Sequence, residues 1–187
     1  MTNAVGIDGT NADDLTKATV TCRRQMDDIV KYLREFVPGY ENCFIISSAS
    51  LIGIRETRHF KGEYTLNEQD ILEAKVFDDY VVKDAYFNFD VHNITGAGLD
   101  KTGVQHGFKQ PKGYTIPYRC LLPVDKENLL LCGRNISGTH MAHSNFRVMP
   151  ICVGIGEAAG VAASITVKKN IPLADVTAEE IRKIIGI

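Results

Sequence analysis

The sequence predicts a mixed α/β fold, and three observations carry the prediction. Apolar side chains recur at helical spacing over residues 12 to 37, whereas aromatic and polar side chains alternate over residues 80 to 92, as in a half-buried strand. A short apolar run from Asn128 to Cys132 stops at Gly133, and a glycine-studded apolar segment opens at Pro150. A strand that ends at a glycine before a small-residue helix is typical of α/β proteins.

The first half of the chain is expected to begin with a long helix. Its apolar stripe runs over residues 12 to 37 and stops at Pro38-Gly39, a pair that ends helices. Residues 43 to 54 are rich in Ile, Phe and Ser, which suits a strand pair or an extended segment. Asn67 can cap a short helix through Glu73, because its side-chain oxygen can accept hydrogen bonds from the first amides.

The second half begins with residues 93 to 113, whose five glycines predict a loop or a hairpin tip. Residues 114 to 122 are again a predicted strand, which Pro117 restricts to an edge or a bulge. Residues 128 to 133 are the third predicted strand, and the helix from Pro150 is expected to pack on it through Gly154, Gly156 and Gly160. A capping box, Thr177 to Glu180, predicts the start of a last helix.

Composition excludes several classes of protein. The chain has 187 residues, is 44% hydrophobic and 24% charged, and carries a net charge of -2 with no basic stripe, so nucleic acid is not an expected partner. Its five cysteines include no C-x-x-C pair, which argues against a redox dithiol or a zinc cage and favours packed, reduced thiols in a cytoplasmic protein. The apolar stretch from Pro150 falls short of the roughly 20 residues that a bilayer requires, so a core helix is expected and no membrane.

The segment from Asn128 to Pro150 also suggests a ligand. A strand that stops at a glycine and a helix that begins at the same crevice commonly hold a phosphate-bearing cofactor, because free amides and the helix dipole favour anions. The fingerprint G-x-G-x-x-G after a strand does not occur in the sequence. The chain is therefore expected to be one piece of a larger protein that binds a nucleotide cofactor.

Several segments carry a resemblance to a known family. Residues 116–164 include Asn-Leu-Leu-Leu-Cys-Gly-Arg-Asn-Ile-Ser-Gly-Thr-His and Arg-Val-Met-Pro, and they resemble the C-terminal part of the FAD-dependent oxidoreductases close to the fumarate reductase-like flavoproteins. Gly53-Ile-Arg-Glu-Thr-Arg and Phe89-Asp-Val-His are similar to the family's middle segment. The resemblance implies an inserted cap or substrate domain over residues 1–113. Residues 114–187 would then be the closing strand and helix of a split FAD-binding domain.

The resemblance also implies cofactor contacts. Gly133 would lie at the ribityl-pyrophosphate region of FAD, and a simple strand-to-loop turn is the alternative explanation of a glycine there. Arg134 is either a phosphate partner or a surface cation. The start of the helix would lie against the isoalloxazine ring. The residues expected to contact it are Arg147 and, through their backbone, Val148, Met149, Pro150 and Ile151.

Candidate catalytic residues are His92, Arg55 and His140. The resemblance puts His140 near the flavin, and His92 is a candidate proton donor or substrate ligand, unless it only bonds to backbone at a strand end. Arg55, with Arg58, can bind a substrate carboxylate or pair with Glu56 or Glu63. His140 and His143 stand three apart without further ligands at suitable spacing, so no metal is expected.

The function that the resemblance implies is hydride transfer between a small organic substrate and the N5 atom of FAD. The chain by itself is expected to be colourless and inactive, and to form homo-oligomers through apolar surface at residues 128 to 133 or in the 150 to 167 helix. An alternative from another class is a non-catalytic module, derived from the cap domain, that binds a ligand or a partner chain.

Overall fold

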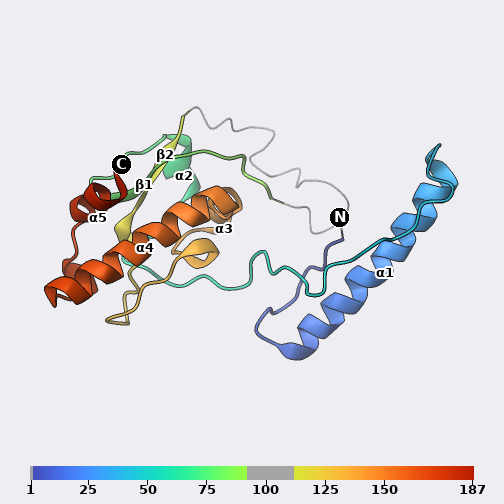
Figure 1. Ribbon diagram of the computed structural model, residues 1–187, viewed down its shortest axis with the longest axis horizontal. Coiled ribbons are helices and arrows are strands. Elements are labelled where there is room, and N and C mark those ends of the chain that lie inside the picture. Colours follow the sequence, from blue (N-terminus) through green and yellow to red (C-terminus); the bar gives the residue numbers. More distant parts are fainter. Residues whose placement is uncertain (1, 92–111) are drawn as a thin grey trace. The chain divides into compact units, whose positions relative to one another are not determined.

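A computed structural model describes residues 2–91 and 112–187 (Figure 1). The chain forms two compact units, Met1–Thr57 and Arg58–Ile187. The fold is mixed α/β, as predicted, with most of its regular structure in helices. The predicted boundary at residues 113/114 separates a cap domain from part of an FAD-binding domain. It is a division by function and not by compactness, and it stays a prediction.

The first unit is built around one long helix, α1 (Ala12–Phe36). The side chain of Asn11 accepts hydrogen bonds from the amides of Asp13 and Asp14, and the helix ends just before Pro38-Gly39, as predicted. Residues 43–54 form no strand and run as an extended segment. Several apolar residues there are largely exposed, with exposed fractions of 72% for Phe44, 89% for Ile46 and 81% for Leu51.

The second unit contains the core. Two antiparallel strands, β1 (Tyr80–Ala85) and β2 (Tyr114–Pro117), form a small sheet whose register is interrupted twice. The other elements of the described unit are four helices and three 3-10 turns: α2 (Glu68–Leu72), η2 (Tyr118–Cys120), η3 (Gly133–Asn135), α3 (His140–Phe146), α4 (Met149–Lys169), η4 (Leu173–Asp175) and α5 (Ala178–Ile185). The predicted Asn67 cap of α2 and the predicted capping box of α5 are both present, and the Asp70 side chain completes a capping box at α2 as well.

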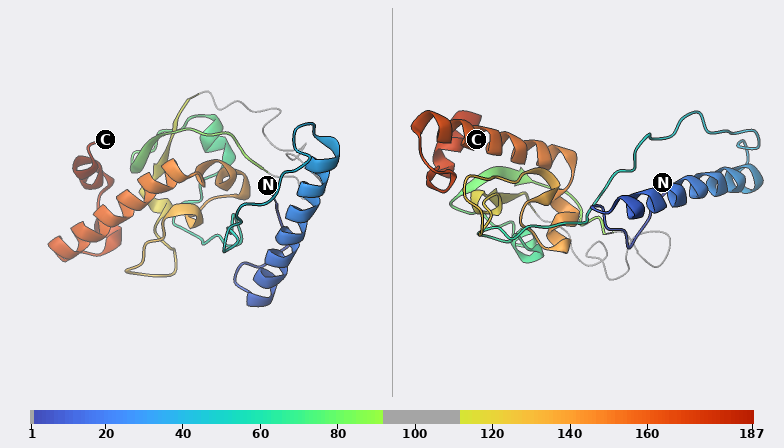
Figure 2. Two further views of the ribbon diagram at one scale, coloured as in Figure 1. Left: turned by 45° about the vertical axis from the view of Figure 1, so that its right-hand side comes forward. Right: turned by 90° about the horizontal axis from the view of Figure 1, so that it is seen from below.

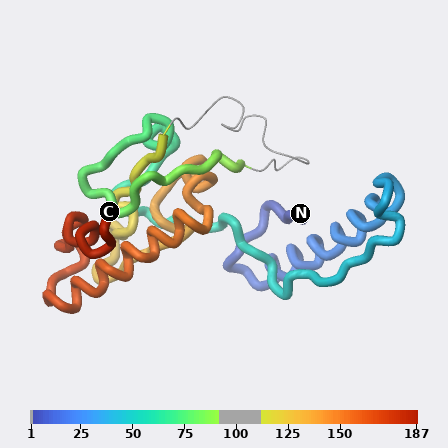
Figure 3. The backbone as a smooth tube through the Cα atoms, turned by 45° about the horizontal axis from the view of Figure 1, so that its top comes forward, coloured from blue at the N-terminus to red at the C-terminus, as the bar shows by residue number. Residues whose placement is uncertain are grey.

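Helix α4 crosses the strand pair, and α5 packs beside it, as Figures 2 and 3 show from three further directions. The buried face of α4 carries Ile151, Ile155, Ala158, Ala162 and Ile165. By length and composition α4 is the helix of the described chain that could cross a membrane, but this buried face packs into the core of the second unit. Packing thus accounts for the apolar side chains of this inner face, whereas Met149, Val153 and Val167 on the outer face are exposed.

Strands β1 and β2 are both shorter than the strands predicted at residues 80–92 and 114–122. Residues 86–91 keep the expected alternation, with Phe89 and Val91 buried and Tyr86 exposed, but β1 has already ended at Ala85. Strand β2 ends at Pro117, after which the chain turns into η2. Alternating burial needs only a surface to pack on, whereas a strand also needs a backbone partner.

The predicted strand at residues 128–133 is wrong. Among the described residues this run forms no β-ladder. One backbone hydrogen bond joins it to another segment, from the Leu131 amide to the Leu121 carbonyl. Leu129 is 42% exposed, and the chain enters η3 at Gly133. The apolar run is an extended link because no neighbouring strand lies there to complete a sheet.

The packing predicted for α4, on a strand at residues 128–133 through three glycines, is wrong, and one of these glycines packs on β1 instead. A Cβ on Gly154 would lie 3.6 Å from the Val82 side chain in β1, so this glycine does allow close helix-to-sheet contact. Positions 156 and 160 have no atom within 4 Å of an added Cβ. Gly156 and Gly160 therefore face away from the sheet, contrary to the prediction.

Candidate functional site

The second unit brings the two predicted cofactor-binding segments together, because η3 contacts α4. Gly133 opens η3 with φ of +79°, a left-handed conformation that side chains other than glycine rarely adopt. The space around its missing Cβ is open. Gly133 is thus required for the turn and leaves backbone accessible beside the start of α4.

Arg134 follows on η3 with an exposed side chain. Burial raises the pKa of the Cys152 thiol in α4, and the positive charge of Arg134 opposes part of that rise. The guanidinium therefore lies close enough to the first turns of α4 to influence a group there. Cys132, predicted to be a packed thiol, is exposed instead, because the extended link leaves it at the surface.

The N-terminus of α4 is open. Val148 provides no side-chain cap, Met149 is 83% exposed, and Pro150 in the first turn has no amide to satisfy. Ile151 is buried in the core, so its side chain is not available to a ligand. These positions can offer amides and a positive dipole end to a negatively charged group.

Arg147, just before α4, has a structural partner. Its guanidinium donates to the backbone carbonyl of Asp90 at 3.0 Å and to the Asp90 carboxylate at 2.7 Å. Both side chains are largely buried. Arg147 thereby ties residues 86–91 to the end of α3, a role that the sequence analysis did not anticipate.

Helix α3 buries unusually polar residues. His143, Ser144 and Asn145 are all at most 3% exposed. Thr139 caps the helix, and its hydroxyl also donates to the Glu68 carboxylate at 3.0 Å. The sequence signal for this helix was weak because it is short and carries no apolar stripe.

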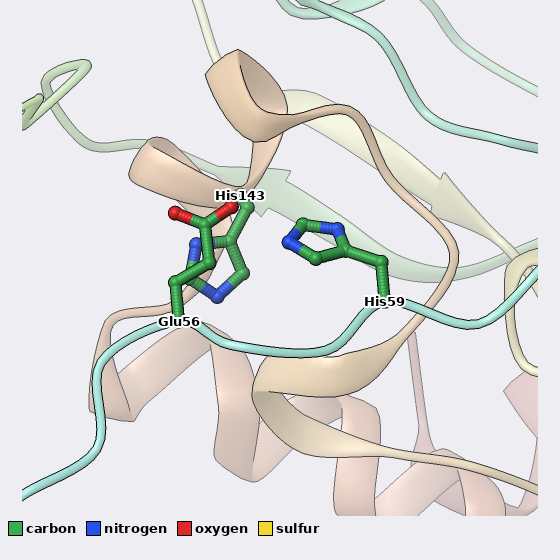
Figure 4. A group of neighbouring side chains, drawn as sticks. All are labelled: Glu56, His59 and His143. Carbon is green, nitrogen blue, oxygen red and sulfur yellow. The ribbon is translucent and has the colours of Figure 1, made fainter. Parts of the chain in front are cut away.

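The two histidines of α3 have different surroundings. His140 is exposed at the first helical position, whereas His143 is 2% exposed. The ring of His143 lies beside that of His59, with 5.1 Å between ring centroids (Figure 4). Sequence reasoning missed His59 because nothing local connects it to residues so distant along the chain.

The remaining predicted site residues are not placed with this group. His92 lies outside the described residues. Arg55 belongs to the first unit, where it is half-buried, and Arg58 is exposed in the second. The catalytic roles of His92, Arg55 and His140 stay predictions.

Comparison with known proteins gives one match. The family model described as FAD dependent oxidoreductase matches residues 1–185, almost the whole chain. No curated protein and no solved structure matches.

Proposed function

Because the chain belongs to the FAD dependent oxidoreductase family, we propose that it is part of a flavoprotein that transfers hydride between a small organic substrate and FAD. Bound FAD would supply the hydride chemistry, and the protein would bind and orient both reactants. The observation that carries the proposal is the family match over residues 1–185.

Local geometry supports a flavin contact at η3 and α4. The open backbone at Gly133 and the uncapped start of α4 are contributed by neighbouring elements of one unit. The residues that would hold the cofactor are those of the two segments: Gly133, Arg134, Arg147, Val148, Met149, Pro150 and Ile151. Their amides and the Arg134 charge would stabilise negative charge that develops on the bound ring or phosphates.

Substrate handling is assigned to side chains outside this pair of segments. Arg55 would bind a carboxylate group of the substrate through its planar fork, and His92 or His140 would hold or deliver a proton near neutral pH. The role of His140 rests on the resemblance to the family, whereas those of Arg55 and His92 rest on the chemistry of their side chains.

The 187-residue chain alone is proposed to bind no stoichiometric flavin and to be inactive, since it has no G-x-G-x-x-G turn for the pyrophosphate. Gly154 and Gly156 begin a G-x-G-x-x-A spacing, but it lies inside α4 and follows no strand.

A flavin spectrum tests the proposal. The chain expressed with its upstream coding sequence should show absorption near about 450 nm that small organic donors bleach anaerobically, whereas residues 1–187 alone should purify colourless. Arg55→Lys should raise KM for carboxylate donors more than it lowers kcat. The lysine ammonium is a point charge and cannot form the two parallel hydrogen bonds of the planar guanidinium. Absence of flavin from the extended protein would refute the proposal.

A second candidate is a non-catalytic module that binds a ligand or partner chain. The exposed apolar side chains of residues 43–54 favour it, because exposed patches of this kind commonly mark contact surfaces. A homo-oligomer through the outer face of α4, where Met149, Val153 and Val167 are exposed, belongs to the same proposal. Residues 128–133 are no longer proposed as part of the oligomer interface, because they form no strand with an unpaired edge. Light scattering at micromolar concentration tests it, and a monomer mass would remove the oligomer.

The compartment and other partners are also proposals. We propose a cytoplasmic protein whose partner is its small-molecule substrate, with neither nucleic acid nor membrane engaged. The near-neutral charge and the packed inner face of α4 support this.

A further inference from the structure

The histidine pair of the second unit has features that flavin chemistry does not require. His143 is buried in α3, and His59 is an exposed residue of the segment that precedes Gly62. The rings are tilted by 53° with centroids 5.1 Å apart, and a ring nitrogen of each lies within 4.8 Å of one on the other (Figure 4).

The hydrogen bond of His59 sets its tautomer. Its Nδ1 atom lies 2.7 Å from the backbone carbonyl oxygen of Gly138, which can only accept a hydrogen bond. Nδ1 therefore carries the hydrogen, and in the neutral ring the lone pair is on Nε2. Figure 4 shows that the second ring nitrogen of His59 is directed to the side on which His143 lies. A backbone carbonyl that accepts from the far nitrogen is the usual support of a metal-binding histidine.

Packing holds the carbonyl and the buried ring in place. A Cβ on Gly138 would come within 2.5 Å of the Phe146 ring, so the loop and α3 are in close contact there. The Phe146 ring also lies edge-on to His143, with centroids 5.5 Å apart. His143 and the carbonyl that orients His59 are thus fixed by the same aromatic side chain, which favours a preorganised site.

The spacing suits a small ion. Two imidazole nitrogens on a tetrahedral ion, each at about 2.0 to 2.1 Å, stand roughly 3.3 Å from each other. In the structure these nitrogens lie within 4.8 Å of each other, so binding would require the exposed His59 ring to move toward His143. The remaining positions would be filled by water, since His59 is open to solvent.

We propose that His59 and His143 form a binding site for a divalent first-row transition-metal ion of the class that prefers imidazole, such as Ni²⁺, Cu²⁺ or Zn²⁺. The site goes beyond the proposed flavin function and does not depend on it. His140, three residues earlier in the same helix, is not part of the site.

Calorimetric titration with Ni²⁺ tests the proposal on the tag-free, full 187-residue chain. Cys132→Ser serves as the background, because an exposed thiol can itself bind metals. The background protein should bind one Ni²⁺. His59→Ala should weaken Ni²⁺ binding by about tenfold or more. Replacing a residue that only supports a metal ligand already costs about tenfold, and His59 would be a ligand itself.

His140→Ala is the matched control, since it removes an exposed imidazole from the same helix, and it should leave binding unchanged. His143→Asn tests the buried partner, with circular dichroism to verify folding. If that variant does not fold, His59→Ala decides. Ni²⁺ should also raise Tm in the background protein and in His140→Ala but not in His59→Ala. No binding by the background protein, or equal weakening by His140→Ala and His59→Ala, would overturn the proposal.

Discussion

The hydroxyl of Tyr114 in β2 donates a 2.9 Å hydrogen bond to the side-chain oxygen of Asn145 in α3. Both residues are fully buried. The amide nitrogen of Asn145 in turn donates to the Phe87 carbonyl. One buried side chain thereby joins the sheet, α3 and the segment after β1, close to the start of α4.

Tyr114→Phe is expected to lower the free energy of unfolding by about 1 to 3 kcal/mol, because it leaves a buried amide oxygen without its donor. Tyr86→Phe, which removes a hydroxyl from a residue that is 60% exposed, should change stability little. Urea denaturation of the two variants measures both effects. Equal stability of Tyr114→Phe and the parent would mean that the bond contributes nothing net.

Leucine substitutions in α4 should separate its two faces. Gly154→Leu would force a branched side chain toward Val82 and should cost about 1 to 3 kcal/mol by overpacking. Gly156→Leu projects into open space, so it should be neutral or slightly stabilising through helix propensity. Thermal unfolding decides, and the reverse order would show that the helix packs through the other face.

Gly133→Ala should destabilise the chain by about 1 to 2 kcal/mol, since alanine is strained at positive φ even where space is open. Gly160→Ala is the control, because it lies in open space within a regular helix and should gain about 0.5 to 1 kcal/mol. Chemical denaturation of both proteins gives the comparison. A Gly133→Ala variant as stable as the parent would contradict the required turn.

Stability should fall in alkaline solution. Burial raises the pKa of the Cys120 thiol from 9.0 to about 12 and that of the Tyr118 phenol from 10.0 to about 12. Since the folded state keeps these protons longer than the unfolded chain, their contribution is fully present below pH 9 and is lost as pH rises toward 12.

Denaturant unfolding between about pH 8 and about pH 11 measures the loss. Cys120→Ala should show a shallower decline because one of the buried acids is gone, whereas Cys132→Ala, at an exposed thiol, should follow the parent. A decline of the same slope in Cys120→Ala would exclude this thiol as a cause.

The helix starts were readable from the sequence because caps are local. Asn67 and Thr177 each accept a hydrogen bond from an amide only three residues away, so the local sequence was enough to predict the cap of α2 and the capping box of α5. The stripe of α1 and the small, apolar composition of α4 are similarly local, and both helices were predicted to within a few residues. Family membership followed from linear motifs in the same way.

Tertiary structure alone decided what depends on partners distant in sequence. Residues 128–133 have the composition of a strand, but a strand needs a neighbouring backbone that completes its hydrogen bonds in a ladder. Within the described residues this run has one such bond, from the Leu131 amide to the Leu121 carbonyl, and forms no ladder. Helical spacing could not tell which glycine of α4 meets Val82, because that depends on the rotation of the helix over the sheet. The pairing of His59 with His143 likewise follows from how the loop at Gly138 packs on α3, and no periodicity along the chain encodes that contact.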